Sequence, residues 1–296
     1  MSGEEKELLV YINGQLVPRE QAKVSVWDAG FQCGDGVYEG LRVYRGGIFQ
    51  LHEHVERLFL CAHAIGIKLP WSRTEVAGAM LQTVRANGLK DDAHIRVSLT
   101  RGDRPHTGMD PRIGGNNPPT FVIIAEPKKP AFPKSGIRLM TSALRRTPAQ
   151  CLDPKLHTLN QLGQVMAKIE ANHAGVNEAL MLDMQGFVAE TNSANIFLAK
   201  GQRLATPRRD SIMPGFTRQL ILGLAPELGF QVVEENLSLA DFYGADEVFI
   251  TGTVNQLVPV VEIDRRLIGE GGPGPVTSKL LNQYLSIAAE KSITKV

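Results

Sequence analysis

The feature that most constrains the fold is a proline- and lysine-rich stretch near the middle of the chain. The segment EPKKPAFPKSG, residues 126–136, contains three prolines and three lysines and almost no apolar periodicity. This composition is typical of an exposed linker between domains. The chain has 296 residues, whereas one domain usually has about 100–200. We therefore expect a small N-terminal domain over residues 1–125, a linker over 126–136 and a larger C-terminal domain over 137–296.

Both halves alternate between strand and helix patterns. The pair Asn13-Gly14 lies between two β-rich runs, which predicts a hairpin. Apolar spacing predicts further strands over residues 40–44, 94–100, 120–125, 138–146, 179–183, 187–190, 195–199 and 246–251. Helical spacing is found over residues 51–65, 73–87, 217–228 and 276–289, and in a helix with Leu159, Leu162, Met166 and Ile169 on one face. The pattern indicates an α+β fold.

Composition excludes several classes of partner and of environment. The net charge of +1 arises from 32 basic and 31 acidic residues scattered along the chain, so no basic field is available for nucleic acid or a membrane surface. The three cysteines, Cys33, Cys61 and Cys151, are odd in number and far apart, which favours a reducing compartment. The start, MSGEEKELL, does not resemble a signal peptide, and no apolar run reaches the roughly 20 residues of a membrane span. We expect a cytoplasmic protein.

A lysine stands at a predicted corner between a strand and a helix. In LDPKLHTLNQLGQVMAKIEA, residues 152–171, Lys155 comes just ahead of the amphipathic helix. Partial burial would lower the pKa of such a lysine, and the neutral amine could form a Schiff base with a carbonyl cofactor. Considered alone, Lys155 is more commonly interpreted as an exposed loop lysine.

Three segments of the C-terminal half have residues suited to holding a phosphorylated cofactor. In GFVAETNSANIFL, Glu190 stands where a strand gives way to a polar turn, and a carboxylate there could keep a pyridine nitrogen protonated. In SIMPGFTRQLILGL, the N–H groups of Phe216 and Thr217 lie at a helix N-terminus, which binds phosphate. In VFITGTVNQ, Thr253 follows a strand and offers a hydroxyl. The alternatives are an edge-strand carboxylate, an ordinary N-cap and a plain turn.

The N-terminal half contributes a glycine-rich strand entry and a helix. The motif GDGVYEG includes Tyr38, and the following helix contains Arg57, whose guanidinium could pair with phosphate. A solvated helix arginine is the alternative for Arg57. His52 and His54 fit surface or helix-start residues better than metal ligands, because no Cys, Asp or His pattern completes a zinc site. We expect no metal.

In this order, the segments resemble the fold-type IV enzymes that depend on pyridoxal 5'-phosphate (PLP). These enzymes include the branched-chain aminotransferases, the D-amino-acid aminotransferases and aminodeoxychorismate lyase. The resemblance extends from about Tyr11 to about Asp264, and GDGVYEG, HVERL, GFVAETNSANIF, MPGFTR and ITGT are its most specific motifs. It implies a small N-terminal α/β domain, a larger barrel-like C-terminal α/β domain, and a site at their junction that a second subunit completes. We therefore expect a homodimer.

The resemblance also implies a role for each candidate residue. Lys155 would form the Schiff base with PLP, and Glu190 would pair with the ring nitrogen. The phosphate would be bound by Arg57, the backbone of Phe216 and Thr217, and Thr253. The substrate pocket would be lined by Tyr38, Arg96 and Val254, with Arg104 and His106 as further contacts for a substrate carboxylate.

The sequence departs from the family at the lysine. In many members the Schiff-base lysine lies three or four positions before the asparagine that opens the helix, but here those positions before Asn160 are His157 and Leu156. We predict that Lys155, five positions before Asn160, is the Schiff-base lysine. The other nearby lysine, Lys168, lies well inside the helix and so away from the corner. The alternative is that His157 holds the catalytic register and the protein binds PLP without efficient transamination. Two other departures, Cys33 and Gln161, leave the stereochemistry of the substrate open.

These residues predict a PLP-dependent aminotransferase. It would move an amino group between a small amino acid, in our prediction a branched-chain L-amino acid, and a 2-oxo acid such as 2-oxoglutarate, with ping-pong kinetics. The alternatives are a D-amino-acid aminotransferase, a lyase of the aminodeoxychorismate type on the same fold, and a PLP-binding protein without catalytic activity.

Overall fold

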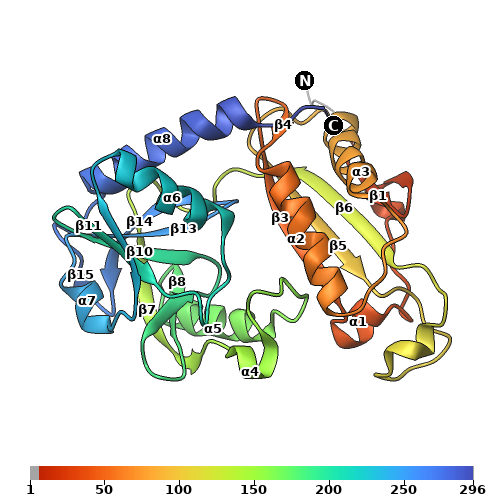
Figure 1. The fold of residues 1–296 in the computed structure, drawn as a ribbon, viewed down its shortest axis with the longest axis horizontal. Coiled ribbons are helices and arrows are strands. Elements are labelled where there is room, and N and C mark those ends of the chain that lie inside the picture. Colours follow the sequence, from red (N-terminus) through yellow and green to blue (C-terminus); the bar gives the residue numbers. More distant parts are fainter. Residues whose placement is uncertain (1–6, 296) are drawn as a thin grey trace. The chain divides into compact units, whose positions relative to one another are not determined.

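The computed structural model describes residues 7–295, which cluster into two compact units (Figure 1). Unit 1 consists of residues 7–129, 156–160 and 288–295, and unit 2 consists of residues 130–155 and 161–287. The first change of unit falls inside the stretch predicted as a linker. Two later segments differ from the predicted division because they pair with unit 1 strands: Thr158 bridges to Val37, and Ile293 bridges to Ile48.

The chain opens with the predicted hairpin. Strand β1 (Leu9–Ile12) pairs antiparallel with β2 (Gln15–Pro18). Asn13 and Gly14 connect them with φ angles of 46° and 97°. Two consecutive positive φ values are what a two-residue type I′ turn needs, and Asn-Gly adopts them at little steric cost. The prediction of a hairpin here is confirmed.

Unit 1 is built on a six-stranded antiparallel sheet in the order β2-β1-β6-β5-β3-β4. Its other strands are β3 (Gly36–Tyr44), β4 (Gly47–Ile48), β5 (Ala93–Thr100) and β6 (Thr120–Pro127). Helices α2 (Leu51–Ala64) and α3 (Arg73–Ala86) lie against these strands, as Figure 1 shows in orange. Short helices are α1 (Ala29–Cys33), η1 (Arg19–Gln21) and η2 (Pro111–Gly114).

The core of unit 1 follows from the spacing of apolar residues on α2. Leu51, Val55 and Leu58 are separated by four and three positions, so they share one face of the helix, and all three are buried. They join Val37 and Leu41 of β3 in one hydrophobic cluster. This packing holds α2 against β3 and thereby fixes the polar residues that both elements carry.

Unit 2 contains a nine-stranded mixed sheet in the order β12-β11-β10-β13-β14-β7-β8-β9, with β15 paired to β14. The strands are β7 (Ile137–Arg145), β8 (Glu178–Leu182), β9 (Val188–Thr191), β10 (Asn195–Lys200), β11 (Arg203–Pro207), β12 (Gln231–Glu235), β13 (Glu247–Gly252), β14 (Gln256–Ile263) and β15 (Arg266–Leu267). Strand β9, at one end of this order, also contacts β10 and β11. The sheet is therefore curled, as the prediction of a barrel-like domain requires.

The helices of unit 2 are α4 (Ala149–Leu152), α5 (Leu162–His173), α6 (Phe216–Glu227), α7 (Leu239–Tyr243) and α8 (Pro275–Lys291). The apolar face predicted for α5 is turned away from the sheet. Small residues, Ala167 and Ala171, pack with β8 side chains, which lets the helix approach closely. Leu162 is 71% exposed, and Met166 and Ile169 are also exposed. Leu159 lies before the helix begins.

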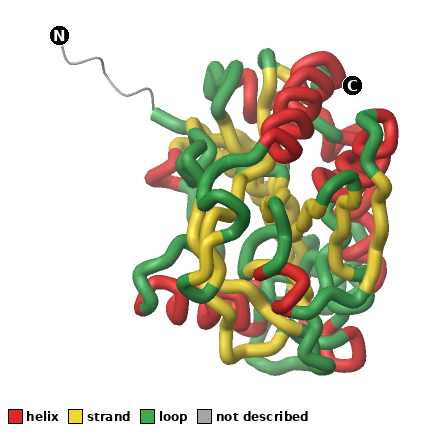
Figure 2. The backbone as a smooth tube through the Cα atoms, turned by 90° about the vertical axis from the view of Figure 1, so that its left-hand side faces the viewer, coloured by secondary structure: helices red, strands yellow, loops and turns green. Residues whose placement is uncertain are grey.

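Figure 2 shows helices and strands intermixed in the part of the chain that the structure describes. One sheet is antiparallel and the other is mixed, so the prediction of an α+β fold with two domains of this kind is confirmed. Within residues 7–295, no helix is both long enough and apolar enough to cross a membrane.

Candidate active site

The carboxylate of Glu190 is a buried and firmly hydrogen-bonded acidic group of unit 2. It is 4% exposed on β9, where its Oε1 accepts a hydrogen bond of 2.6 Å from Arg146 Nε. Its Oε2 accepts one of 2.9 Å from Asn195 Nδ2, and the backbone N–H of Met213 approaches both oxygens at 3.2 Å. Burial raises the pKa of Glu190, and the neighbouring charge of Arg146 opposes this rise. The site is fixed in position and favours a cationic partner.

Helix α6 begins at Phe216, one residue before the predicted start at Thr217. Its N-cap, Gly215, has no side chain to accept from the first N–H groups, and a Cβ there would lie 2.3 Å from Asn195 Oδ1. Thr217 is 1% exposed, yet its Oγ1 has no hydrogen-bond partner within residues 7–295. Leaving a buried hydroxyl unpaired is costly. An orphaned hydroxyl at the N-terminus of a helix, where the helix dipole is positive, is suited to an anion such as a phosphate.

Two more predicted residues of unit 2 follow β13. Thr253 and Val254 lie in the turn after this strand, and both are half-buried. The neighbouring Thr251, inside β13, is 2% exposed, and its Oγ1 also has no hydrogen-bond partner among the described residues. Thr251 was not predicted as a site residue, although it belongs to the ITGT motif.

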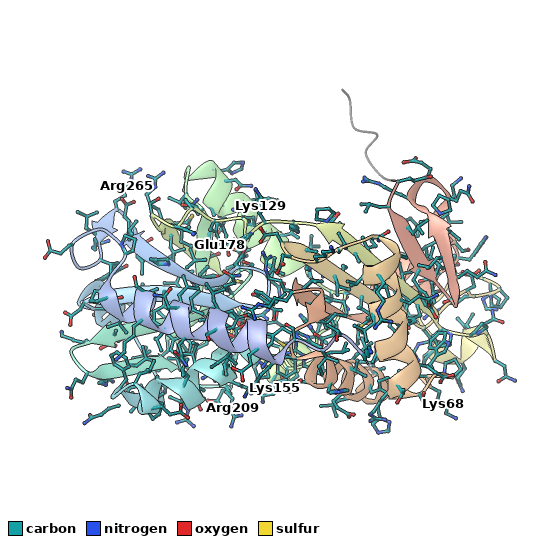
Figure 3. All side chains as sticks on the ribbon, turned by 90° about the horizontal axis from the view of Figure 1, so that it is seen from above. Lys68, Lys129, Lys155, Glu178, Arg209 and Arg265 are labelled. Atoms are coloured by element: carbon teal, nitrogen blue, oxygen red, sulfur yellow. The ribbon has the colours of Figure 1, made fainter. Side chains whose placement is uncertain are left out.

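Lys155 lies in a turn after α4 and is exposed (labelled in Figure 3). Its backbone N–H donates a 2.9 Å hydrogen bond to Asp153 Oδ1. The turn is therefore an Asx-type turn, in which a side chain caps the backbone two residues later. The structure does not give Lys155 the partly buried environment that its predicted role assumes.

A group of four ionisable side chains lies inside unit 1, centred on Glu39 of β3. Glu39 is fully buried, and Arg57 Nε and Nη2 donate to its two oxygens at 2.7 and 2.8 Å. His54 Nδ1 lies 2.6 Å from Oε2, and His157 Nδ1 lies 3.4 Å from Oε1. We call Glu39, His54, Arg57 and His157 the Glu39 cluster. Arg57, predicted to bind phosphate, is thus paired with a carboxylate in this structure.

The charges of the Glu39 cluster are set by burial and by one another. Burial alone would raise the pKa of Glu39, but the adjacent His157 and Arg57 outweigh it and hold this pKa well below the usual range. Burial lowers the pKa of His157 and of His54, against the opposing effect of Glu39. At neutral pH we therefore assign an ionised Glu39 paired with Arg57.

Tyr38 stacks next to this cluster. Its ring centroid is 3.8 Å from that of His157, and the Arg96 guanidinium carbon lies 3.5 Å from the Tyr38 centroid. The backbone N–H of Tyr38 donates to the His157 carbonyl at 2.8 Å. Two predicted pocket residues, Tyr38 and Arg96, are therefore brought together, and His157 joins them.

Arg104 and His106, the predicted carboxylate contacts, are in different environments. Arg104 is buried, and its NH2 donates to Asp35 Oδ2 at 2.8 Å. Arg101 binds the same carboxylate through Nε and NH2 at 2.7 and 2.9 Å. His106 is exposed. In this structure the carboxylate that Arg104 contacts is that of Asp35.

Sequence reasoning missed the partners that fix the predicted residues. Arg146 lies 44 positions from Glu190, and no local motif connects the two. Glu39 stands within GDGVYEG, and its burial could have been suspected because alternate residues of a strand share one face. No group of His, Cys, Asp and Glu side chains suited to a metal ion is found within residues 7–295.

Comparison with known proteins shows which family and which relatives this chain is similar to. A family model described as amino-transferase class IV matches residues 36–263. A putative branched-chain-amino-acid aminotransferase of Methanocaldococcus jannaschii is 45% identical over 285 residues, which cover 96% of this chain and 98% of that protein. The branched-chain-amino-acid aminotransferase-like protein 2 of Arabidopsis thaliana is 45% identical over 95% of this chain. This chain spans only 50% of that plant protein.

A solved structure matches at the level of the whole fold. The branched-chain amino acid aminotransferase of Thermoproteus uzoniensis, solved with norvaline, superposes with a TM-score of 0.90 at 32% sequence identity. The match covers 96% of this chain and 96% of that one. Another solved branched-chain amino acid aminotransferase, complexed with N-(5'-phosphopyridoxyl)-L-glutamate, superposes equally well, with a TM-score of 0.90 at 34% identity. The ligand in that second structure joins a pyridoxyl phosphate group to an amino acid.

Proposed function

The chain belongs to the class IV aminotransferases, and from that premise we propose that it transfers amino groups with PLP as cofactor. The predicted resemblance to fold-type IV PLP enzymes is confirmed. As substrates we propose a branched-chain L-amino acid and a 2-oxo acid such as 2-oxoglutarate. The observation that carries the proposal is the buried carboxylate of Glu190, which is held by Arg146 and Asn195 and suits a cationic ring nitrogen.

When bound, PLP supplies an electron sink for the charge that develops at the substrate α-carbon. In our proposal Glu190 pairs with the ring nitrogen and favours its protonated form. An adjacent positive charge would in turn lower the raised pKa of Glu190, because opposite charges stabilise each other's ionised form. Arg146 and Asn195 position Glu190.

We propose that the phosphate is held at the N-terminus of α6. The N–H groups of Phe216 and Thr217 would donate to it, and the Thr217 hydroxyl would gain the partner that it lacks among the described residues. Thr253 and Arg57 stay predicted phosphate contacts. For Arg57 this role requires the guanidinium to serve the phosphate as well as Glu39, to which it already donates.

The substrate contacts also stay proposals. Tyr38 and Arg96 are supported by their mutual stacking, which presents an aromatic face and a cation together. Arg104, His106 and Val254 stay predictions from the resemblance. Lys155 stays the predicted lysine for covalent attachment of the cofactor.

We also propose a homodimer in the cytoplasm. Support for self-association comes from α5, where Leu162, Val165, Met166 and Ile169 form an exposed apolar stripe, since such patches mark contact surfaces. Support for a reducing compartment comes from Cys33, Cys61 and Cys151, which form no disulfide.

The visible spectrum of the PLP-loaded chain tests the proposed function. L-leucine, L-glutamate, D-alanine and a chiral amine are added one at a time, without an amino acceptor. We expect L-leucine and L-glutamate to convert the aldehyde form of the cofactor into the amine form, with one keto acid released per site. Conversion by D-alanine alone would indicate a D-amino-acid aminotransferase. Release of pyruvate from aminodeoxychorismate without any acceptor would indicate a lyase, and a spectrum that no donor changes would contradict the proposal.

A further inference from the structure

We propose that Thr251 is a further contact for the cofactor phosphate, in addition to the residues predicted from the sequence. This inference rests on the proposed function, because it adds a residue to the phosphate site at the start of α6. All the residues that carry it belong to unit 2. It starts from the Thr251 hydroxyl, which is buried and whose Oγ1 has no hydrogen-bond partner within residues 7–295.

The side chain of Thr251 lies on the same face of the sheet as that of Asn195. Strands β10 and β13 are antiparallel neighbours, and their register pairs Asn195 directly with Thr251. Residues paired in this way have their Cβ atoms on one face and about 4.5–5.5 Å apart. The next pair on that face, Phe197 and Phe249, stacks with 5.2 Å between ring centroids. Thr251 is therefore a direct neighbour of the Asn195 side chain.

The segment that leads into α6 contacts the same asparagine. Asn195 Nδ2 donates to the Met213 carbonyl at 2.8 Å, and a Cβ on Gly215 would lie 2.3 Å from Asn195 Oδ1. Helix α6 also packs against β13 (Figure 1). The second residue of this helix is Thr217, whose hydroxyl is unpartnered among the described residues. The start of α6 and the side chain of Thr251 are thus both next to Asn195.

Two buried hydroxyls that lack a partner point to an anionic ligand. A β-branched shape suits a strand, but valine has the same shape as threonine and carries no polar atom that burial would leave unpaired. A phosphate offers three acceptor oxygens, so it can accept from both Thr251 and Thr217 where the helix dipole is positive. Because β13 is held between β10 and β14, Thr251 is fixed in position before the ligand binds.

Removing the hydroxyl tests the inference first in the full-length chain without cofactor. In Thr251→Val we expect the midpoint of thermal unfolding to stay at or above that of the natural chain, because no hydrogen bond within the protein is lost. The matched control is Thr277→Val, at a buried threonine whose Oγ1 donates to Glu247 at 2.7 Å. This control should lower the midpoint. An equally lowered midpoint in Thr251→Val would show a structural role and contradict the inference.

Cofactor binding tests the contact itself. Equilibrium dialysis of the full-length chain gives the dissociation constants of PLP and of pyridoxal, which lacks the phosphate. We expect Thr251→Val to weaken the binding of PLP at least about tenfold and to leave that of pyridoxal unchanged. Thr251→Ser restores the hydroxyl and should restore the affinity for PLP, whereas Thr277→Val should change neither affinity. An equal loss for both ligands, or no loss for PLP, would overturn the role of Thr251.

Inorganic phosphate separates this inference from the proposed function. At an ionic strength matched with chloride, we expect phosphate to raise the unfolding midpoint of the natural chain more than that of Thr251→Val. A natural chain that shows this difference but binds no PLP would contradict the proposed function and support Thr251 as an anion contact. A natural chain that binds PLP, while phosphate stabilises both chains equally, would contradict only this inference.

Discussion

Among single residues, a substitution at Glu190 has the clearest expected effect on turnover. Glu190→Gln keeps the shape of the side chain and its contact with Asn195, but it removes the negative charge. We expect PLP to remain bound and turnover to fall on the order of 100-fold, because an electrostatic partner of the reacting system is lost. The measurement is the rate of keto acid release from L-leucine, compared with the cofactor content of the same sample. Glu178→Gln, the same change at another buried carboxylate of unit 2, serves as the control. Near-natural turnover of Glu190→Gln would contradict the assignment.

His94 is expected to lower the stability of the folded protein as the pH falls. Burial, followed by the charge of Lys128, lowers its pKa from 6.5 to about 4 in the folded protein. As the pH falls below 6.5, His94 therefore becomes protonated in the unfolded chain but stays neutral in the folded chain. The free energy of unfolding decreases as a result until the pH reaches about 4. Between pH 7 and pH 5 we expect this residue to remove up to about 2 kcal/mol of the free energy of unfolding.

Urea unfolding at these two pH values checks this expectation. His94→Gln should lose less stability on acidification than the natural chain, whereas His52→Gln, at an exposed position, should lose as much. Equal pH dependence in His94→Gln and the natural chain would show that other groups dominate, among them His54 and His157, whose pKa values burial also lowers.

Single residues also show what sequence patterns can and cannot predict. The place of Glu190 at the end of a strand and of Thr217 at the start of a helix was predictable, because both are local features of the sequence. The ion pairs of Arg146 with Glu190 and of Glu39 with His157 were not predictable, since the fold brings these partners together over long sequence separations. For Lys155 the pattern predicted a structured corner, but not the exposure of the side chain.

At the scale of elements, helix α3 is stabilised by its first residues. Ser72 accepts from the Glu75 N–H, and the Glu75 carboxylate accepts from the Ser72 N–H at 2.7 Å, which is a complete capping box. We expect Ser72→Ala to cost about 1 kcal/mol, because the first turn of the helix loses its side-chain acceptor. Thermal unfolding measures the loss. Ser72→Asp retains an N-cap acceptor and should stay close to the natural midpoint, and an equal loss in both variants would contradict the capping argument.

Helix α5 gives a prediction about self-association. Its stripe of Leu162, Val165, Met166 and Ile169 is exposed, so a charge placed there should not disturb the core of unit 2. If the stripe lies in the proposed homodimer contact, Leu162→Glu should weaken dimerisation at least about tenfold in sedimentation equilibrium. Asn172→Glu, a charge placed at an exposed position elsewhere on the same helix, is the control. A dimer of unchanged affinity in Leu162→Glu would place the contact on another surface.

Elements were predictable where one face is buried and turns are marked by glycine or asparagine. The hairpin at Asn13-Gly14 and the start of α6 belong to this class. Strand β14 was missed because five of its eight residues are buried and its apolar run LVPVV shows no alternation. The start of β3 at Gly36 was also missed, because glycine weakens the strand pattern, although Gly36 and Gly40 both pair with β5.

At the scale of the whole molecule, the division into two units was partly visible in the sequence. The proline- and lysine-rich stretch contains the change from Lys129 to Pro130. The return of residues 156–160 to unit 1 was not visible, because it depends on the bridge between Thr158 and Val37. This return is what places His157 in the Glu39 cluster, so one non-local bridge decides which of two neighbouring residues shares the chemistry of unit 1.

We propose that the chain moves an amino group in two separate half-reactions. The direct measurement incubates the PLP-loaded chain with ¹⁵N-labelled L-leucine, removes all free amino acid, and then adds 2-oxoglutarate. We predict one equivalent of labelled L-glutamate per site, because the nitrogen is stored on the protein between the two additions. Glutamate without label, or no glutamate after the donor is removed, would contradict transfer in two half-reactions.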